Sequence, residues 1–176
     1  MPKGPFLPSQ FIATQWSTEK DKADFANSVL HFIESEFKQT LFTRKLYERL
    51  SNTFGNIAHY NLTGFWEEWF TTEADRVRFL ENLLHWPCYG DPKFTFSDVE
   101  RALQREIGTR DYLFRYQAIA DAALRSKEVA MLETLEAKYR SPISVEAPVK
   151  RTSVDQAEQV KSPSVIDAPS VQASLF

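Results

Sequence analysis

The composition of the chain changes sharply after Arg140, and this break constrains the fold more than any other feature of the sequence. Residues 141–176 hold four of the nine prolines, no glycine, and no aromatic residue before the final Phe176. Such a segment has almost nothing large to bury, so it cannot offset the entropy that ordering would cost. We therefore expect a folded region that ends near Arg140, a disordered linker over residues 141–171, and a separate terminal segment, 172–176.

The region before this break predicts an all-α fold, an irregular bundle of five to six helices. Apolar residues recur there at the spacing of a helix face, and the first such set is Phe25, Val29, Phe32, Ile33 and Phe37. Ser17 or Thr18 can cap this first helix, and Asp21 would complete a capping box with Thr18. No convincing strand alternation occurs, although residues 54–63 could form a small hairpin.

Further helices are expected over residues 44–53, from Thr63 or Gly64, from Thr72 to near His85, from a Ser97 cap to Gly108, and over residues 110–139. The last of these would be about 40 Å long. Its expected apolar stripe is Leu113, Tyr116, Ala120, Leu124, Met131 and Leu135. Residues 1–16 combine three prolines with large apolar side chains, which predicts an extended arm lying across the helical domain of residues 17–140.

The charge of the chain argues against direct binding of nucleic acid by the folded region. The formal net charge is −3 and the predicted pI is about 5.7. Phosphate binding needs a clustered excess of Lys and Arg, so any DNA contact is expected to be indirect or weak. No apolar run reaches the length of a signal peptide or membrane span, and Cys88 is the single cysteine. We expect a cytoplasmic protein without a membrane contact.

The chain ends in Gln172-Ala173-Ser174-Leu175-Phe176. This segment resembles the peptide by which bacterial DNA-processing proteins bind the β sliding clamp, the processivity factor of the DNA polymerase, whose pattern is Q-x-x-L-F. The resemblance implies that the clamp is a partner, that Leu175 and Phe176 enter an apolar cleft, and that the Gln172 amide meets a polar subsite. Ala173 and Ser174 would set the distance between the two.

Three functions are compatible with this resemblance. The first is a non-enzymatic adaptor, bacterial or phage in origin, that is recruited to the clamp during DNA replication or repair. The second is an inhibitor, of the kind that phages or toxin systems encode, that blocks the clamp pocket and arrests replication. The third is a DNA-processing enzyme recruited to the clamp. The sequence contains no phosphate-binding loop or nucleophile motif, so we name no catalytic residue and no cofactor.

Two clusters in the body have a structural and a functional interpretation. Phe65, Trp66, Trp69 and Phe70 share one helix face, which is most simply a core face. A protein-binding groove and a stacking platform for single-stranded DNA are the alternatives. Glu67, Glu68, Glu73 and Asp75 follow His59 in the sequence and could form a carboxylate site, although acids in the first turn of a helix explain Glu73 and Asp75.

A metal site is not expected. His85 and Cys88 have H-x-x-C spacing, but a zinc site needs three or four protein ligands and the chain offers one thiol.

Overall fold

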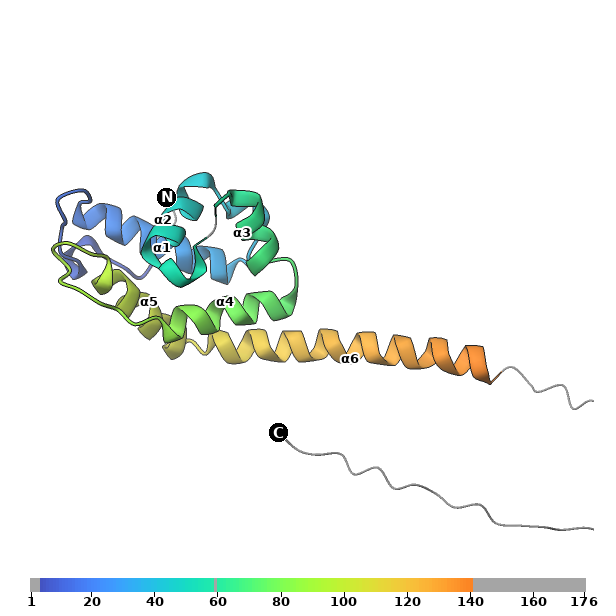
Figure 1. Cartoon of the computed structure of the whole chain (residues 1–176). Coiled ribbons are helices and arrows are strands. Elements are labelled where there is room, and N and C mark those ends of the chain that lie inside the picture. Colours follow the sequence, from blue (N-terminus) through green and yellow to red (C-terminus); the bar gives the residue numbers. More distant parts are fainter. Residues whose placement is uncertain (1–3, 59, 141–176) are drawn as a thin grey trace, which may run out of the picture. The chain divides into compact units, whose positions relative to one another are not determined.

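The computed structural model describes residues 4–58 and 60–140, and in this part of the chain it contains helices and no strand (Figure 1). The α-helices are α1 (Glu19–Glu34), α2 (Arg44–Thr53), α3 (Leu62–Trp69), α4 (Glu73–His85), α5 (Ser97–Thr109) and α6 (Tyr112–Tyr139). Short 3-10 helices span Pro8–Gln10, Gln39–Leu41 and Gly55–Ile57. The all-α prediction is confirmed, and the predictions for residues 141–176 lie outside the described part.

Helix starts that depend on a local cap agree with the sequence. The Thr18 hydroxyl accepts the Asp21 amide at 3.1 Å, and the Asp21 carboxylate accepts the Thr18 amide at 3.1 Å, so the capping box is confirmed. The same reciprocal pair forms between Thr72 and Asp75 at the start of α4. α2 has the expected bounds, with Thr43 as its cap.

Other boundaries differ from the prediction by one or two residues. α3 begins at Leu62 because the Asn61 side chain caps it by accepting the Gly64 amide at 2.6 Å. Ser97 is the first residue of α5 and no cap, since its hydroxyl donates to the Gly90 carbonyl at 2.9 Å instead. α5 passes through Gly108, and α6 begins at Tyr112 because Asp111 has a left-handed φ of 52°.

The segment that could have been a hairpin is a 3-10 helix at Gly55–Ile57. The shifted helix ends depend on the side-chain hydrogen bonds of Asn61 and Ser97 and on the backbone conformation of Asp111, which hydrophobic periodicity does not report.

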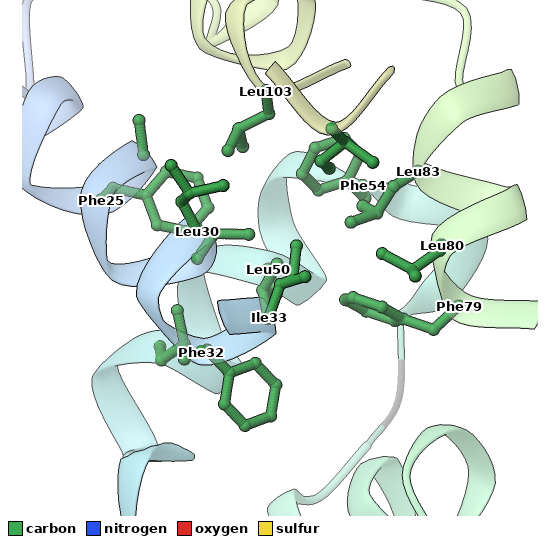
Figure 2. Close-up of a cluster of buried hydrophobic side chains, with 14 of the residues drawn as sticks. Phe25, Leu30, Phe32, Ile33, Leu50, Phe54, Phe79, Leu80, Leu83 and Leu103 are labelled. Carbon is green, nitrogen blue, oxygen red and sulfur yellow. The ribbon is translucent and has the colours of Figure 1, made fainter. Parts of the chain in front are cut away.

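The core gathers apolar side chains from α1, α2, α4 and α5, which point toward one another in Figure 2. Its labelled members are Phe25, Leu30, Phe32, Ile33, Leu50, Phe54, Phe79, Leu80, Leu83 and Leu103. All of these side chains are buried. The stripe predicted for the first helix is thus a core face.

Part of the N-terminal arm packs on α1, and it contains one 3-10 turn at Pro8–Gln10. Phe6 and Phe11 are buried. The Asn27 side chain of α1 donates to the Phe6 carbonyl at 2.9 Å and accepts the Phe6 amide at 3.1 Å. Gly4 lies so close to Asn27 that an added Cβ would stand 2.0 Å from its Oδ1 atom. This contact fixes the arm at its start.

Lys22 on α1 is fully buried and joins α1 to α5. Its Nζ atom donates to the carbonyls of Pro92 and Thr95, both at 2.8 Å, and to the Asp98 carboxylate at 2.9 Å. The three hydrogens of the ammonium group therefore all have acceptors, which a buried charge requires. Lys22 holds the loop before α5 against α1.

α6 packs on the body over its first turns only. Tyr112 and Tyr116 are buried, and the Tyr116 hydroxyl donates to the Ile33 carbonyl at 2.6 Å. Beyond Ala123 every residue of the helix is exposed, and α6 extends past the other helices (Figure 1). The predicted apolar stripe is therefore a core contact at Tyr116 and a solvent-facing surface from Leu124 onward.

Candidate functional site

The residues predicted to bind the clamp, Gln172, Ser174, Leu175 and Phe176, lie outside the described part of the chain. They stay a prediction from the sequence.

The aromatic face of α3 belongs to the core. Phe65 and Phe70 have no exposed surface, and Trp69 is buried beside them. Trp66 is half-buried and packs with its ring centroid 5.5 Å from that of Phe42. These four rings pack against other core side chains, as the structural interpretation of this face predicts.

The acidic residues near this face have structural partners. Asp75 is occupied in the capping box with Thr72, and Glu73 pairs with Arg76 at 2.9 Å. Glu68 pairs with Arg78 at 3.0 Å. Glu73 and Asp75 lie in the first turn of α4, which confirms that they are acidic residues of a helix start. His59 lies outside the described residues.

A pocket of about 520 Å³ lies elsewhere, between the end of α2 and the loop of residues 86–96. Its walls include the rings of Trp86, Tyr89 and Phe94 together with Arg49 and Glu100. Tyr89 and Phe94 are 76% and 78% exposed. Rings exposed to this extent are available to a ligand or to a side chain of another protein.

Glu100 is the unusual group of this pocket. Only 5% of its surface is exposed, and its Oε2 atom is buried without a hydrogen-bond partner. Burial raises the pKa of the Glu100 carboxyl, while the neighbouring Cys88 and Trp86 side chains and the charge of Arg101 act in the opposite direction. A buried acceptor without a donor costs free energy and is accordingly rare.

The loop that carries the pocket is held by its own polar contacts. Gln104 of α5 donates to the carbonyls of Leu83 and Trp86 at 3.0 and 2.7 Å. Arg101 donates to the Cys88 carbonyl at 3.1 Å. Gly90 has a left-handed φ of 88°, where a Cβ atom would also stand 2.7 Å from Thr95. Together with Lys22, these contacts fix the rings around Glu100.

Cys88 next to this pocket is not an activated nucleophile. Burial raises the pKa of the Cys88 thiol to about 11, and the neighbouring Glu100 carboxylate adds to the shift. The thiol is therefore protonated at neutral pH, whereas nucleophilic cysteines carry a lowered pKa. Its sulfur donates to the Gln104 Oε1 atom at 3.3 Å. The exposed rings of Tyr89 and Phe94 are the part of the pocket that is open to a partner, whereas the Oε2 atom of Glu100 is buried.

Within the described residues, no further side chains join His85 and Cys88 to complete a metal site. No group of three or more His, Cys, Asp and Glu side chains lies close enough there to hold an ion. The Nδ1 atom of His85 lies 2.8 Å from the Glu81 carbonyl one helical turn earlier.

Sequence reasoning missed Glu100 and Lys22, and a usable signal existed for Lys22. It stands three residues before Phe25 and seven before Val29, on the apolar stripe of α1. A lysine at a core position requires a buried acceptor elsewhere. Glu100 gave a weaker signal, since it lies beside Asp98 in the first turn of α5, where acidic residues are typical of a helix start.

Replacing Glu100 with glutamine is expected to stabilise the protein at neutral pH. A carboxyl whose pKa is raised by folding favours the folded state only while protonated, so its stabilising contribution is lost as pH rises through the folded-state pKa. Glu100→Gln should match the wild type at pH 4 and below, near the pKa of an unfolded Glu, and exceed its free energy of unfolding by about 1–2 kcal/mol at pH 8. Urea titrations across this pH range measure the difference.

The control for this substitution is Glu67→Gln, which removes one negative charge from an exposed position of α3. If Glu100→Gln were less stable than the wild type at pH 8, the carboxylate would have a stabilising partner and our interpretation of Glu100 would be wrong.

Comparison with known proteins leaves the chain without an assigned family. No family model matches it, and neither the curated proteins nor the solved structures include a significant match. None of the described helices combines the length and the apolar content needed to cross a membrane.

Proposed function

We propose that this protein is a non-enzymatic adaptor that is recruited to the bacterial β sliding clamp by its C-terminal peptide and acts in DNA replication or repair. The observation that carries the proposal is the match of Gln172, Leu175 and Phe176 to the Q-x-x-L-F pattern at the end of the chain. Two large apolar residues that end a polar, proline-containing segment have no role in that segment's own composition.

The organisation of the chain supports recruitment through a tether. The core of the described residues lies before Arg140, and 36 residues follow Arg140 in the sequence. If residues 141–171 form the disordered linker that their composition predicts, its root-mean-square reach is roughly 30–35 Å. The terminal peptide could therefore occupy a clamp pocket while the body contacts a different partner through its own surface.

The affinity of this contact is expected to be micromolar. Leu175 and Phe176 each gain roughly 1.5–3 kcal/mol when fully buried. Ordering of the peptide and the loss of its free motion offset part of this gain. A contact of this strength is reversible, which suits a protein that shares the clamp with a polymerase.

The test is a titration of the full chain with purified β clamp by isothermal calorimetry. The wild type should bind with a micromolar Kd, and Leu175→Ala/Phe176→Ala should weaken binding by at least about 100-fold, because both apolar anchors are lost. The matched control is Val165→Ala/Ile166→Ala, which truncates two apolar residues of the same segment outside the motif. Control and wild type should bind equally.

Each other outcome contradicts part of the proposal. If the wild type does not bind the clamp, recruitment is wrong. If the double variant binds as tightly as the wild type, the contact lies outside Leu175 and Phe176. Overexpression in a bacterial host then separates the two roles of a bound protein: growth arrest that depends on Leu175 and Phe176 identifies an inhibitor, and normal growth identifies an adaptor.

A further inference from the structure

The pocket between α2 and the loop of residues 86–96 combines two features that the fold does not need. Tyr89 and Phe94 are 76% and 78% exposed, and both line the pocket together with Trp86. Glu100 of α5 also lines it, and its Oε2 atom is buried without a hydrogen-bond partner. The unpaired carboxyl costs folding free energy, and rings left in solvent contribute little to folding. Their presence in one pocket points to a ligand.

The cations around this pocket already have partners. Arg49, which lines the pocket, donates to the Asp21 carbonyl at 3.2 Å, and another of its nitrogens lies 3.9 Å from the Asp21 carboxylate. Arg101 donates to the Cys88 carbonyl at 3.1 Å and acts on Glu100 through its charge. Neither guanidinium group donates a hydrogen bond to the Oε2 atom of Glu100. The carboxylate therefore remains able to attract a further cation, and its burial strengthens that attraction.

The burial of the carboxylate also selects the kind of cation. Because the Oε2 atom is buried, Glu100 attracts a ligand by its charge and not by accepting a hydrogen bond at that atom. The exposed rings of Tyr89 and Phe94 have faces that attract a cation and carbon edges that accept no hydrogen bond. A primary ammonium group packed against such rings leaves N–H donors unpaired, which costs free energy. A quaternary ammonium group has no N–H donor and avoids that cost.

We propose that this pocket binds a quaternary ammonium group against Trp86, Tyr89 and Phe94, with Glu100 as the buried opposite charge. Its volume of about 520 Å³ is large enough for such a group together with part of the molecule that carries it. The group occurs on small choline-like amines and on trimethylated lysine side chains of proteins. Both sources present the same positive charge and the same methyl surface, so the pocket recognises this shared chemistry.

The test is a titration of the full chain at about pH 8, followed by the NMR signals of the Trp86 indole and of the amides of residues 86–96. The probe is choline, and its neutral control is 3,3-dimethylbutan-1-ol, which has the same shape without the charge. Choline should bind with a Kd of about 1 mM, and the neutral control should bind at least about tenfold more weakly. No clamp is present, so this result is independent of the proposed function.

Variants assign the roles of the carboxylate and the rings. Glu100→Gln should weaken choline binding by about tenfold and leave binding of the neutral control unchanged, because it removes only the charge. The gain in stability expected for this variant separates lost binding from lost folding. Tyr89→Ala and Phe94→Ala should each weaken binding of both molecules, since they remove contact surface. The matched control Glu67→Gln, which removes an exposed charge of α3, should bind choline like the wild type.

A peptide with one trimethylated lysine distinguishes the two sources. Tighter binding of this peptide than of choline identifies a protein ligand, and weaker binding identifies a free amine. The same peptide with an unmodified lysine should bind at least about tenfold more weakly than its trimethylated form. The proposal is overturned if choline causes no shift up to about 50 mM, or if choline and its neutral control bind equally. Unchanged choline affinity in Glu100→Gln would also overturn it.

Discussion

Lys22→Ala is expected to lower the free energy of unfolding by about 3–5 kcal/mol, a large fraction of the stability of a domain of this size. The substitution removes the ammonium group that Asp98 pairs with at 2.9 Å and that the carbonyls of Pro92 and Thr95 accept from at 2.8 Å. The Asp98 side chain is only 13% exposed, so water cannot fully replace the lost partner. Equilibrium urea unfolding, followed by circular dichroism, measures the change.

The control is Lys20→Ala, two residues earlier on α1. Lys20 is exposed and pairs with Asp24 at 2.6 Å one turn later, a surface contact that contributes little to stability because water screens it. A double-mutant cycle with Lys22→Met and Asp98→Asn isolates the ion pair. The double variant should lose less stability than the sum of the two single variants, because each single variant leaves one charge unpaired and the double variant leaves none. Additive losses, or a Lys22→Ala effect as small as that of Lys20→Ala, would contradict this account.

Local signals explain which parts of the fold could be predicted. The capping boxes at Thr18 and Thr72 are each complete within four residues, and both form as the sequence indicates. The apolar stripe of α1 has the same local character. The predicted cap of α5 is wrong because the Ser97 hydroxyl donates to the Gly90 carbonyl, seven residues earlier. This hydrogen bond competes with helix capping.

The candidate site could not be predicted for a related reason. Its members come from α2, the 86–96 loop and α5, and no single segment shows the pattern of a pocket. Glu100 looks like an ordinary first-turn acid of a helix, and only the packed structure reveals that its Oε2 atom is buried without a partner. The terminal peptide differs from the pocket, because five consecutive residues carry the whole resemblance. Such a motif can be recognised from the sequence without a structure.

α6 shows where periodicity reaches its limit. The sequence predicts one apolar stripe from Leu113 to Leu135, and a stripe alone does not say what covers it. The body covers Tyr116, whereas Leu124, Met131 and Leu135 face solvent. The same pattern therefore encodes a core contact at one end of the helix and a solvent-exposed surface at the other.

Phe37→Ala is expected to cost about 3–5 kcal/mol of unfolding free energy and to loosen α6 from the body. Phe37 follows α1 and is 1% exposed. Its ring lies against rings from four other places in the chain, with centroid distances of 5.1 Å to Phe32, 5.3 Å to Phe70, 5.8 Å to Phe79 and 5.0 Å to Tyr116. Removing it leaves a cavity where α1, α4 and α6 meet, and packed cores do not collapse fully around such a gap.

The backbone at Phe37 makes alanine an informative replacement. Its φ of 55° is left-handed, a conformation that costs any residue with a Cβ atom about 1–2 kcal/mol. Alanine retains that cost and loses the ring, so the measured difference reports the aromatic contacts. Phe114→Ala is the control, since it removes the same group from a 74% exposed position of α6 and should change stability by less than about 0.5 kcal/mol.

Hydrogen exchange tests the second half of this prediction. Tyr116 holds α6 on the body through its contact with the Phe37 ring and its hydrogen bond to the Ile33 carbonyl. Amides in the first turns of α6 should therefore exchange faster in Phe37→Ala than in the wild type when the two are compared at matched global stability. Phe37→Leu, which fills part of the cavity, should lie between alanine and the wild type and remains measurable if the alanine variant does not fold. A loss below about 1 kcal/mol for alanine would mean that the other rings hold α6 without Phe37, and the ring cluster would not be the contact that joins this helix to the core.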